Sequence, residues 1–390
     1  MRILRLPRTQ AERTARPVRV CFLIDELATA GTETQLLALI RHLDRRRVTP
    51  ILCLLRGDSP VSRALEPDDC PVYRLGVGSL RSPVTLARAW GFARLLRREK
   101  VDVLQVYFPD STYFGLPLAR LAGVPHRLRT RNNLGHWMTP LHRLLGRLLH
   151  GCATGTLTNC EAARKALVRD ERIAPERVVV LENGVDLDCF LSVPLPRTVR
   201  PSQVGVVANL RPVKGLDVLL DAAARLSADH PDLTFRIAGE GEQRAFLQSR
   251  AEEKGLAARF QLCGSIRDVP AFLTDVEIAV QPSRSEGMSN ALLEYMAAGR
   301  AIVATAVGAA TDLVADERHG LLVPPDDAGA LAAAIARLVR NPFLIRALGQ
   351  AARERAQRDY SREAMVRRFE DFYEELMGFS SVSQSVRRVA

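Results

Sequence analysis

Two glutamates, Glu286 and Glu294, are the residues whose type and spacing most suggest chemistry. They stand eight positions apart in SRSEGMSNALLEYMAAGRAIVAT (283–305), on either side of a Ser-Asn turn that opens a helix. Apolar runs at 278–280 and 301–305 flank this stretch, so it predicts a strand, a turn, a helix and a second strand. Folding alone does not require acids at both ends of such a helix, and we therefore expect them to bind a ligand.

A pair of carboxylates also raises the possibility of a glycoside hydrolase. At a rise of about 1.5 Å per residue, acids at the two ends of one helix would lie ~12 Å apart. Hydrolysis requires carboxylates roughly 5–9.5 Å apart. The spacing therefore favours binding roles, although acids also occur at helix N-termini for electrostatic reasons alone, which applies to Glu286 in particular.

A second group of candidates is basic. Arg211 and Lys214 lie in NLRPVKG (209–215), between a predicted strand and a predicted helix, and two cations beside helix amides suit a diphosphate. The turn AGEGE (238–242) carries two glycines at a similar position. Arg244 stands where a dinucleotide-binding fingerprint has its third glycine, so that interpretation fails.

Strands and helices alternate through both halves of the chain, which is typical of βαβ units and parallel sheets. Strands are expected at 18–24, 49–55, 70–75, 101–107, 126–130, 153–158 and 177–181, and again at 204–210, 233–239, 259–264, 277–282 and 301–305. The fold class is therefore α/β, with ligands expected at the carboxyl ends of the strands.

A proline-rich, irregular stretch between the two series predicts an interdomain linker. The expected organisation is a basic tail at 1–17, a first domain at 18–187, the linker at 188–203, a second domain at 204–360, a helix at 361–378 and a tail at 379–390. The last helix is amphipathic and could stay with the second domain or fold back over the first.

The composition is that of a globular protein: of 390 residues, 47% are hydrophobic and 25% are charged. No run approaches the ~18 uncharged apolar residues that span a bilayer. The N-terminus lacks the apolar region of a secretory signal. Seven scattered cysteines without a C-x-x-C motif predict free thiols in a reducing compartment and no metal site, so we expect a cytoplasmic protein.

The net charge of +11 is concentrated in residues 1–200, which predicts an anionic partner for that half. The helical segments 85–100 and 138–150 each place apolar residues on one side and basic residues on the other. The apolar sides are expected to pack on a sheet, while the basic sides could lie on the inner face of an anionic membrane. Nucleic acid is ranked well below, because no helix-turn-helix, zinc or RNA-binding aromatic motif is present.

Four ordered motifs carry a family resemblance: NGVD (183–186), NLRPVKGLDVLLDA (209–222), AGEGE (238–242) and SEGMSNALLEYMAAGRAIVAT (285–305). Together they resemble the retaining glycosyltransferases of the GT-B fold, specifically the group 1 (family 4) type with an E-x7-E motif. The resemblance extends over about residues 18–380. It implies a GT-B architecture, in which two Rossmann-like parallel-sheet domains face a central cleft.

The resemblance also implies roles. Arg211, Lys214 and Glu286 would act in catalysis, the two cations on the donor's diphosphate and Glu286 on the transferred sugar, while Glu294 would accept hydrogen bonds from the ribose. The resemblance implies further donor-binding positions in these motifs and in the segments AGTET (30–34) and LCGSIR (262–267): Gly31, Gly239, Gly264, Ser265, Gly287, Met288 and Ser289. Gly31 belongs to AGTET, where Ala30 replaces the first glycine of the usual pair.

One departure concerns the acceptor. Many relatives have a histidine after the fifth strand of the first domain, where this chain has Arg131, Asn132 and Asn133. The acceptor-side candidates are therefore Asp110, Arg131, Asn132 and His136. Retaining transfer of this type needs little help from a general base, so the missing histidine does not exclude catalysis.

The sequence thus predicts transfer of a hexose-type sugar from a nucleotide-diphosphate sugar to an acceptor hydroxyl, with UDP favoured and GDP possible. No metal and no other cofactor is expected. By resemblance, the acceptor would be lipid-linked or a saccharide, in bacterial surface polysaccharide or glycolipid assembly. Two alternatives stay open: a non-catalytic scaffold that binds nucleotide sugars, and a nucleotide-sugar epimerase on the same fold.

Overall fold

The computed structural model describes residues 16–80, 82–135, 139, 146, 149, 151–196 and 202–378. The chain forms two compact units. Unit 1 is made of two segments of the chain, the residues up to Asn183 and those from Glu363 onward, and unit 2 is Gly184–Arg362. Each unit is built on one parallel sheet, which confirms the predicted α/β class with two Rossmann-like domains.

The sheet of unit 1 has seven strands in the order β3-β2-β1-β4-β5-β6-β7. They are β1 (Val18–Ile24), β2 (Val48–Leu54), β3 (Val72–Arg74), β4 (Val103–Tyr107), β5 (His126–Thr130), β6 (Gly155–Thr158) and β7 (Val178–Val180). The central strand β1, VRVCFLI, is apolar on both faces and almost wholly buried, as a strand covered by helices on both sides requires.

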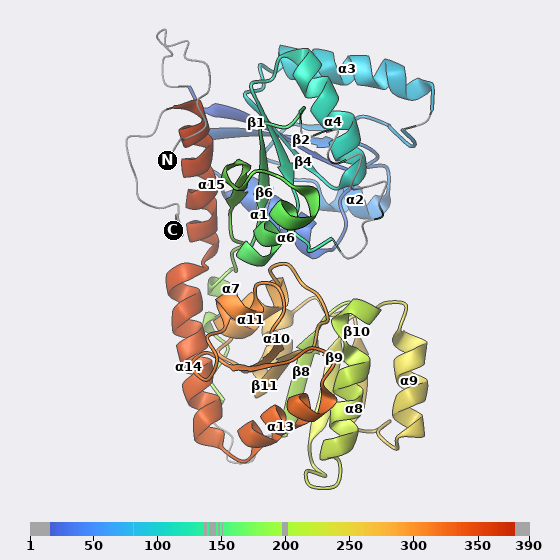
Figure 1. Ribbon diagram of the computed structural model, residues 1–390, viewed down its shortest axis with the longest axis vertical. Coiled ribbons are helices and arrows are strands. Elements are labelled where there is room, and N and C mark those ends of the chain that lie inside the picture. Colours follow the sequence, from blue (N-terminus) through green and yellow to red (C-terminus); the bar gives the residue numbers. More distant parts are fainter. Residues whose placement is uncertain are drawn as a thin grey trace. The chain divides into compact units, whose positions relative to one another are not determined.

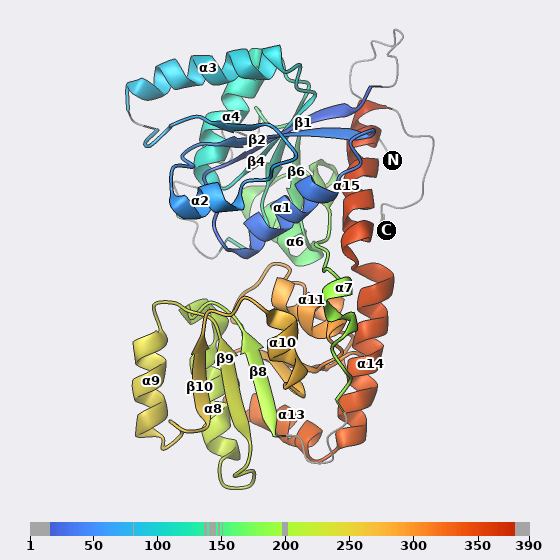
Figure 2. The same ribbon diagram turned by 180° about the vertical axis from the view of Figure 1, so that it is seen from behind.

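Helices cover both faces of this sheet (Figures 1 and 2). They are α1 (Gly31–His42), α2 (Pro60–Leu65), α3 (Val84–Arg98), α4 (Pro109–Ala122), α6 (Glu161–Glu171) and α15 (Arg362–Met377). Phe22 packs with α1 and α15 on one face, and Leu23 packs with α3 and α4 on the other. The buried Tyr373 hydroxyl of α15 also donates to Oε1 of Gln105 at 2.7 Å, so the last helix completes the core of unit 1.

The sheet of unit 2 has six strands in the order β10-β9-β8-β11-β12-β13. They are β8 (Gln203–Val207), β9 (Thr234–Ala238), β10 (Phe260–Gly264), β11 (Ile278–Gln281), β12 (Ala301–Thr305) and β13 (Leu321–Val323). The strand β13 has only three residues, and the sequence pattern did not predict it.

Unit 2 holds most of the remaining helices: α7 (Asp188–Leu191), α8 (Leu216–Leu226), α9 (Arg244–Glu253), α10 (Val269–Thr274), α11 (Asn290–Ala297), α12 (Ala310–Leu313), α13 (Ala328–Val339) and α14 (Pro342–Asp359). Helices α8, α9, α13 and α14 share one core with Val204 and Val206 of β8. Gly205, between these two residues, faces the other side, where a Cβ would collide with Val276 at the end of the α10 turn. The missing side chain therefore lets that turn sit directly on the strand.

The segment 188–203 was expected to be a linker between the domains, but its described residues belong to unit 2. Residues up to Pro196 pack against unit 2. Arg353 donates to the carbonyl of Val193 at 2.6 Å, and the buried Arg300 donates to the carbonyl of Pro194. Residues 197–201 lie outside the described part of the chain.

Among the described residues, no single helix is long and apolar enough to cross a membrane. Helices α13 and α14 reach the length and apolar composition of a membrane span only together, and the angle between them is 103°. Both helices contribute buried residues to the core of unit 2. Most of the predicted amphipathic segment 138–150 lies outside the described residues.

Candidate functional site

The candidate donor-binding residues of unit 2 lie on loops at the carboxyl edge of its sheet. Strand β8 pairs with β9 on one side and with β11 on the other, so the order of connections reverses between β8 and β11. Ligands of open α/β sheets bind at such a switch point. The loop after β8 carries Arg211 and Lys214, and the loop after β11 carries Glu286.

The structure brings Lys214 and Glu286 together. The Lys214 ammonium forms an ion pair with Oε1 of Glu286, and Ser283 donates to the same oxygen at 2.9 Å. The two charged side chains are 23% and 14% exposed, so the pair is accessible to a ligand at one side. Arg211 is exposed at the start of the same turn, Pro212–Lys214. An ammonium group and a carboxylate are therefore presented together at this edge, with Arg211 in the same turn as Lys214.

A close backbone contact fixes this pair. Gly215, directly after Lys214, has φ of 64°, and an added Cβ would collide with the carbonyl oxygen of Pro282. Only glycine combines this left-handed conformation with such proximity. The loops after β8 and β11 are thus in backbone contact where the ion pair forms.

Arg284 joins the same two loops, although its role was not predicted. Its guanidinium donates to both carboxylate oxygens of Asp217 at 2.8 and 2.9 Å, and to the carbonyl of Pro212 at 2.6 Å. It also donates to Asp326 at 2.6 Å, and its backbone amide donates to the carbonyl of Val213 at 2.8 Å. Arg284 therefore positions the turn that carries Lys214.

Arg284 and Asp217 each shift the pKa of the other so that both stay charged. Burial alone would raise the pKa of Asp217, but the hydrogen bond and charge of Arg284 outweigh it and hold that pKa below its ordinary value. The hydrogen bond to Asp217 raises the pKa of Arg284 in turn. Both groups remain ionised at neutral pH.

The position of the two glutamates corrects the simple picture of acids at both ends of one helix. Helix α11 begins at Asn290, with Ser289 as its N-cap accepting from the amide of Leu292 at 3.3 Å. Glu286 lies on the loop before this cap, and Glu294 lies inside the helix. The expected separation of ~12 Å assumed an unbroken helix between them and does not apply.

Glu294 has a distinctive environment. Within the described part of the chain, its carboxylate makes no hydrogen bond or ion pair. Burial raises its pKa to about 7. The next residue, Tyr295, accepts a hydrogen bond at 2.6 Å from the amide of Val207 at the end of β8, which holds this part of α11 at the switch point. A carboxylate desolvated in this way suits hydroxyl donors from a ligand.

The predicted glycines occupy the neighbouring turns of the same edge. Gly239 follows β9 and donates its amide to the carbonyl of Gly264, the last residue of β10, at 2.8 Å. Ser265 comes directly after it. The carbonyl of Gly287 accepts from the amide of Ala309, after β12, at 2.9 Å, and Met288 is buried beside it. Five consecutive strand ends thus contribute to one edge.

The unit 1 candidates divide into two groups. Gly31 is the first residue of α1, directly after the loop that follows β1. Asp110, in the first turn of α4, forms an ion pair with Arg56. Arg131 and Asn132 instead line a cavity of about 110 Å³ after β5, which Asp110 does not line. His136 lies outside the described residues.

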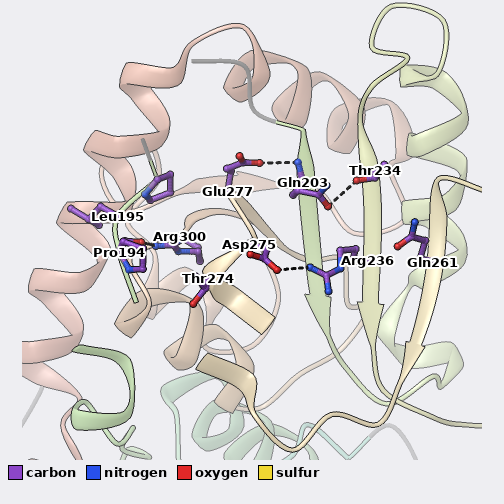
Figure 3. A pocket seen from close by; sticks show the side chains of 11 residues that line it. Pro194, Leu195, Gln203, Thr234, Arg236, Gln261, Thr274, Asp275, Glu277 and Arg300 are labelled. Carbon is purple, nitrogen blue, oxygen red and sulfur yellow. Dashed lines mark hydrogen bonds and ion pairs between the residues drawn. The ribbon is translucent and has the colours of Figure 1, made fainter. Parts of the chain in front are cut away.

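A cavity of about 770 Å³ in unit 2 is lined by none of these residues. It lies toward the amino-terminal part of the unit 2 sheet (Figure 3). Its polar side chains bond to one another: Thr234 to Gln203 at 2.8 Å, and Arg236 to Asp275 at 3.3 Å. We therefore assign no ligand to it. In the described residues no three His, Cys, Asp or Glu side chains are grouped to hold a metal ion.

Two family models match the chain. The model described as "Glycosyl transferase 4-like domain" matches residues 30–184, and the one described as "Glycosyl transferases group 1" matches residues 201–341. Together they extend over well more than half of the sequence. The chain belongs to the group 1 glycosyltransferases. It is therefore a transferase, as predicted.

Relatives of this glycosyltransferase agree with the assignment. It is 27% identical to a 2-deoxystreptamine glucosyltransferase of Streptomyces kanamyceticus, over 73% of its own length and 82% of that protein. It is 25% identical to the UDP-Gal:alpha-D-GlcNAc-diphosphoundecaprenol alpha-1,3-galactosyltransferase of Escherichia coli, over 64% of its own length and 70% of that protein. Other relatives, such as an MMP alpha-(1->4)-mannosyltransferase of Mycolicibacterium hassiacum, are matched over about half of their length, 53% in this case.

Solved structures show the same fold. Alr3699/HepE of Anabaena, in complex with UDP, is similar with a TM-score of 0.79 at 18% identity, covering 92% of this chain and 100% of that one. The sucrose-phosphate synthase of Thermosynechococcus elongatus is similar with a TM-score of 0.77 at 21% identity, covering 93% of this chain and 100% of that one. At these identities the likeness concerns the fold, which is the predicted GT-B type.

Proposed function

We propose that this glycosyltransferase moves a hexose-type sugar, with retention at the anomeric carbon, from a nucleotide-diphosphate sugar to an acceptor hydroxyl. One observation carries the proposal: at the switch point of unit 2, the Lys214–Glu286 pair stands at the same sheet edge as the carboxylate of Glu294, which has no hydrogen-bond or ion-pair partner among the described residues. A cation for phosphates and two carboxylates for hydroxyls are the groups that a nucleotide sugar requires.

Each residue then has a role. Lys214 and Arg211 hold the diphosphate, and the Glu286 carboxylate, already oriented by Lys214 and Ser283, binds hydroxyls of the transferred sugar. Glu294 accepts hydrogen bonds from the ribose. The backbone at Gly287–Ser289, ahead of α11, donates to phosphate or sugar oxygens, because amides at a helix start favour anions.

The proposed reaction is balanced without a further reactant. The bond between the anomeric carbon and the diphosphate oxygen breaks, and the acceptor oxygen bonds to the same face of that carbon. The acceptor's proton passes to the departing diphosphate. Negative charge therefore develops on the diphosphate, where Lys214 and Arg211 stabilise it without moving. Neither a metal ion nor a redox cofactor takes part.

UDP is the favoured nucleotide. The structure of Alr3699/HepE with a TM-score of 0.79 was solved with UDP, and the Escherichia coli relative is named for UDP-Gal and a diphosphoundecaprenol-linked sugar. GDP remains the second choice. The same relative supports a lipid-linked acceptor, and hence a place in surface polysaccharide or glycolipid assembly on the cytoplasmic side of a membrane.

Helix α3 is the described element best suited to contact that membrane. Leu86 and Trp90 are exposed on it, 77% and 58% respectively, and Arg94 stacks on the Trp90 ring at 5.5 Å. An exposed apolar and basic helix face suits an anionic lipid surface. Binding to vesicles of anionic phospholipid should weaken as salt rises, because basic residues supply the attraction. Flotation that ignores salt would contradict this contact.

Release of the nucleotide tests the proposed function. UDP should appear from a UDP-hexose only when an acceptor is added, and EDTA should leave the rate unchanged. An acceptor mixture extracted from bacterial lipid-linked saccharides can serve as the first probe, with the product's anomeric configuration read by NMR. Binding without turnover under all acceptors would indicate the scaffold. An epimeric UDP-sugar formed without acceptor, or the free epimer and UDP formed by addition of water, would indicate the epimerase.

A further inference from the structure

Gln281 is a buried polar residue at the carboxyl edge of the unit 2 sheet. It is the last residue of β11, directly before the loop that carries Glu286, and it is 5% exposed. Within the described part of the chain, neither its side-chain oxygen nor its side-chain nitrogen makes a hydrogen bond. A buried amide without a hydrogen bond costs stability, whereas an apolar side chain of the same size would not. A glutamine at this position therefore needs a reason other than folding.

The alternation of side chains along β11 fixes the face of the sheet on which Gln281 lies. Ile278 and Val280 belong to the core that the sheet shares with α8, α9, α13 and α14. Successive side chains of a strand point to opposite faces, so Gln281 points to the other face. The neighbouring strand agrees, since Gly205, which pairs with Ala279, also faces that side. The amide of Gln281 is therefore directed away from this core.

Helix α11 meets the sheet at the level of Gln281. Gln281 and Val207 each lie two residues beyond the last residue pair of β11 with β8, so they stand at the same level of these parallel strands. The amide of Val207 donates to the Tyr295 hydroxyl of α11 at 2.6 Å. Burial raises the pKa of Tyr295, and the nearby charges of Glu294 and Glu286 raise it further. Gln281 thus belongs to the same edge as both candidate donor-binding carboxylates.

The backbone of Gln281 is held by the neighbouring strand β12. Gln281 pairs with Ala304 in the parallel register of β11 and β12. The hydroxyl of Thr305, a residue that is 2% exposed, donates to the carbonyl of Ser283 at 2.6 Å and lies 3.3 Å from the carbonyl of Gln281. A side chain on a backbone anchored in this way can meet a ligand without the cost of ordering the chain.

The chemistry of Gln281 complements that of Glu294. A carboxylate accepts the protons of ribose hydroxyls, but it cannot donate to their oxygens, whereas a glutamine NH₂ group supplies such donors. We propose that Gln281 is a ribose-binding residue, whose side-chain NH₂ donates to the oxygen of a ribose hydroxyl while Glu294 accepts the proton of that hydroxyl. This inference rests on the proposed function and adds to it that the donor site selects ribonucleotides over deoxyribonucleotides.

Deoxynucleotides test this role on the wild-type protein. Calorimetric titration with UDP, 2′-deoxy-UDP and 3′-deoxy-UDP should show that at least one of the two analogues binds about tenfold or more weakly than UDP, because the missing hydroxyl leaves buried polar groups unpaired. This arm needs no variant, so it does not depend on the folding of an altered protein.

Gln281→Met assigns the selection to the amide, because methionine has a similar length but no N–H donor. UDP affinity should fall by about tenfold in this variant, and the difference between UDP and the weaker analogue should shrink by a similar factor. Gln261→Met is the matched control: Gln261 is exposed on β10 of the same sheet and donates to the carbonyl of Ala258 at 3.2 Å. Its UDP affinity and its selectivity should equal those of the wild type.

Two results would overturn the role of Gln281 and leave the proposed function intact. One is a wild-type protein that binds UDP and both deoxy analogues with equal affinity. The other is a folded Gln281→Met protein that keeps the wild-type preference for UDP, which would show that the amide has a structural role only. Binding of neither UDP nor GDP to the wild type would overturn the proposed function, and this inference with it.

Discussion

Replacement of Arg284 tests how the donor loops are held. The guanidinium makes four hydrogen bonds, two to Asp217, one to Asp326 and one to the carbonyl of Pro212. Arg284 and Asp217 are 31% and 25% exposed, so each contact is worth more than a surface pair but less than a buried one. Together they should contribute about 1–2 kcal/mol to the order of the Lys214 turn.

If this order is lost in Arg284→Ala, donor binding must restore it. UDP affinity should then fall roughly 5- to 30-fold, which is the equivalent of 1–2 kcal/mol. Steady-state kinetics should show a higher KM for the donor, with kcat changing less. Arg284→Lys keeps the charge but loses the two-pronged contact with Asp217, and we expect an intermediate affinity.

Arg236→Ala is the matched control, because Arg236 also forms an ion pair in unit 2, with Asp275 at 3.3 Å, beside the cavity at the other end of the sheet. Its UDP affinity should equal that of the wild type. Wild-type UDP affinity in Arg284→Ala, with the fold intact by circular dichroism, would refute the positioning role.

Two further predictions concern Glu294 and Gly215. The pKa of Glu294 is about 7 in the folded protein against an ordinary 4.5, so the folded state binds the extra proton between these values, and the free energy of unfolding falls as pH rises through this range. Urea unfolding should therefore show Glu294→Gln to be more stable than the wild type at pH 8, by up to about 3 kcal/mol, and no more stable than it near pH 4. If the variant and the wild type are equally stable at both pH values, the pKa of Glu294 is not raised. In Gly215→Ala the new Cβ would collide with the carbonyl oxygen of Pro282, so this variant should lose both stability and UDP affinity. Gly255→Ala is its control, because Gly255 has a similar φ of 68° but open space around it. This variant should lose only about 1 kcal/mol of stability and should bind UDP as the wild type does. Equal losses in the two glycine variants would show that the contact with Pro282 is unimportant.

The alternation of strands and helices could be predicted because each strand is an uninterrupted apolar run, as β1 and β12 show. The start of the helix in the segment 283–305 also followed from the sequence, because the Ser-Asn turn expected to open it is where Ser289 caps α11. The short strand β13 was missed because three residues carry too little periodicity to distinguish a strand from a turn.

Long-range partners could not be predicted. Arg284 and Asp217 are 67 residues apart, and only the pairing of β8 with β11 brings them together. The assumption behind the expected distance between the two glutamates fails for a local reason: the helix starts only at Asn290, so Glu286 lies outside it.

The central claim is that the switch point of unit 2 binds a nucleotide-diphosphate sugar through Lys214. Calorimetric titration with UDP tests this most directly, with Lys254→Ala as control, since Lys254 pairs with Asp221 at 3.1 Å and belongs to no predicted site. Lys214→Ala should lose UDP affinity by about tenfold or more, because a charge-assisted contact with the diphosphate is removed, and Lys254→Ala should keep it. Equal UDP affinity in wild type and Lys214→Ala would contradict the account.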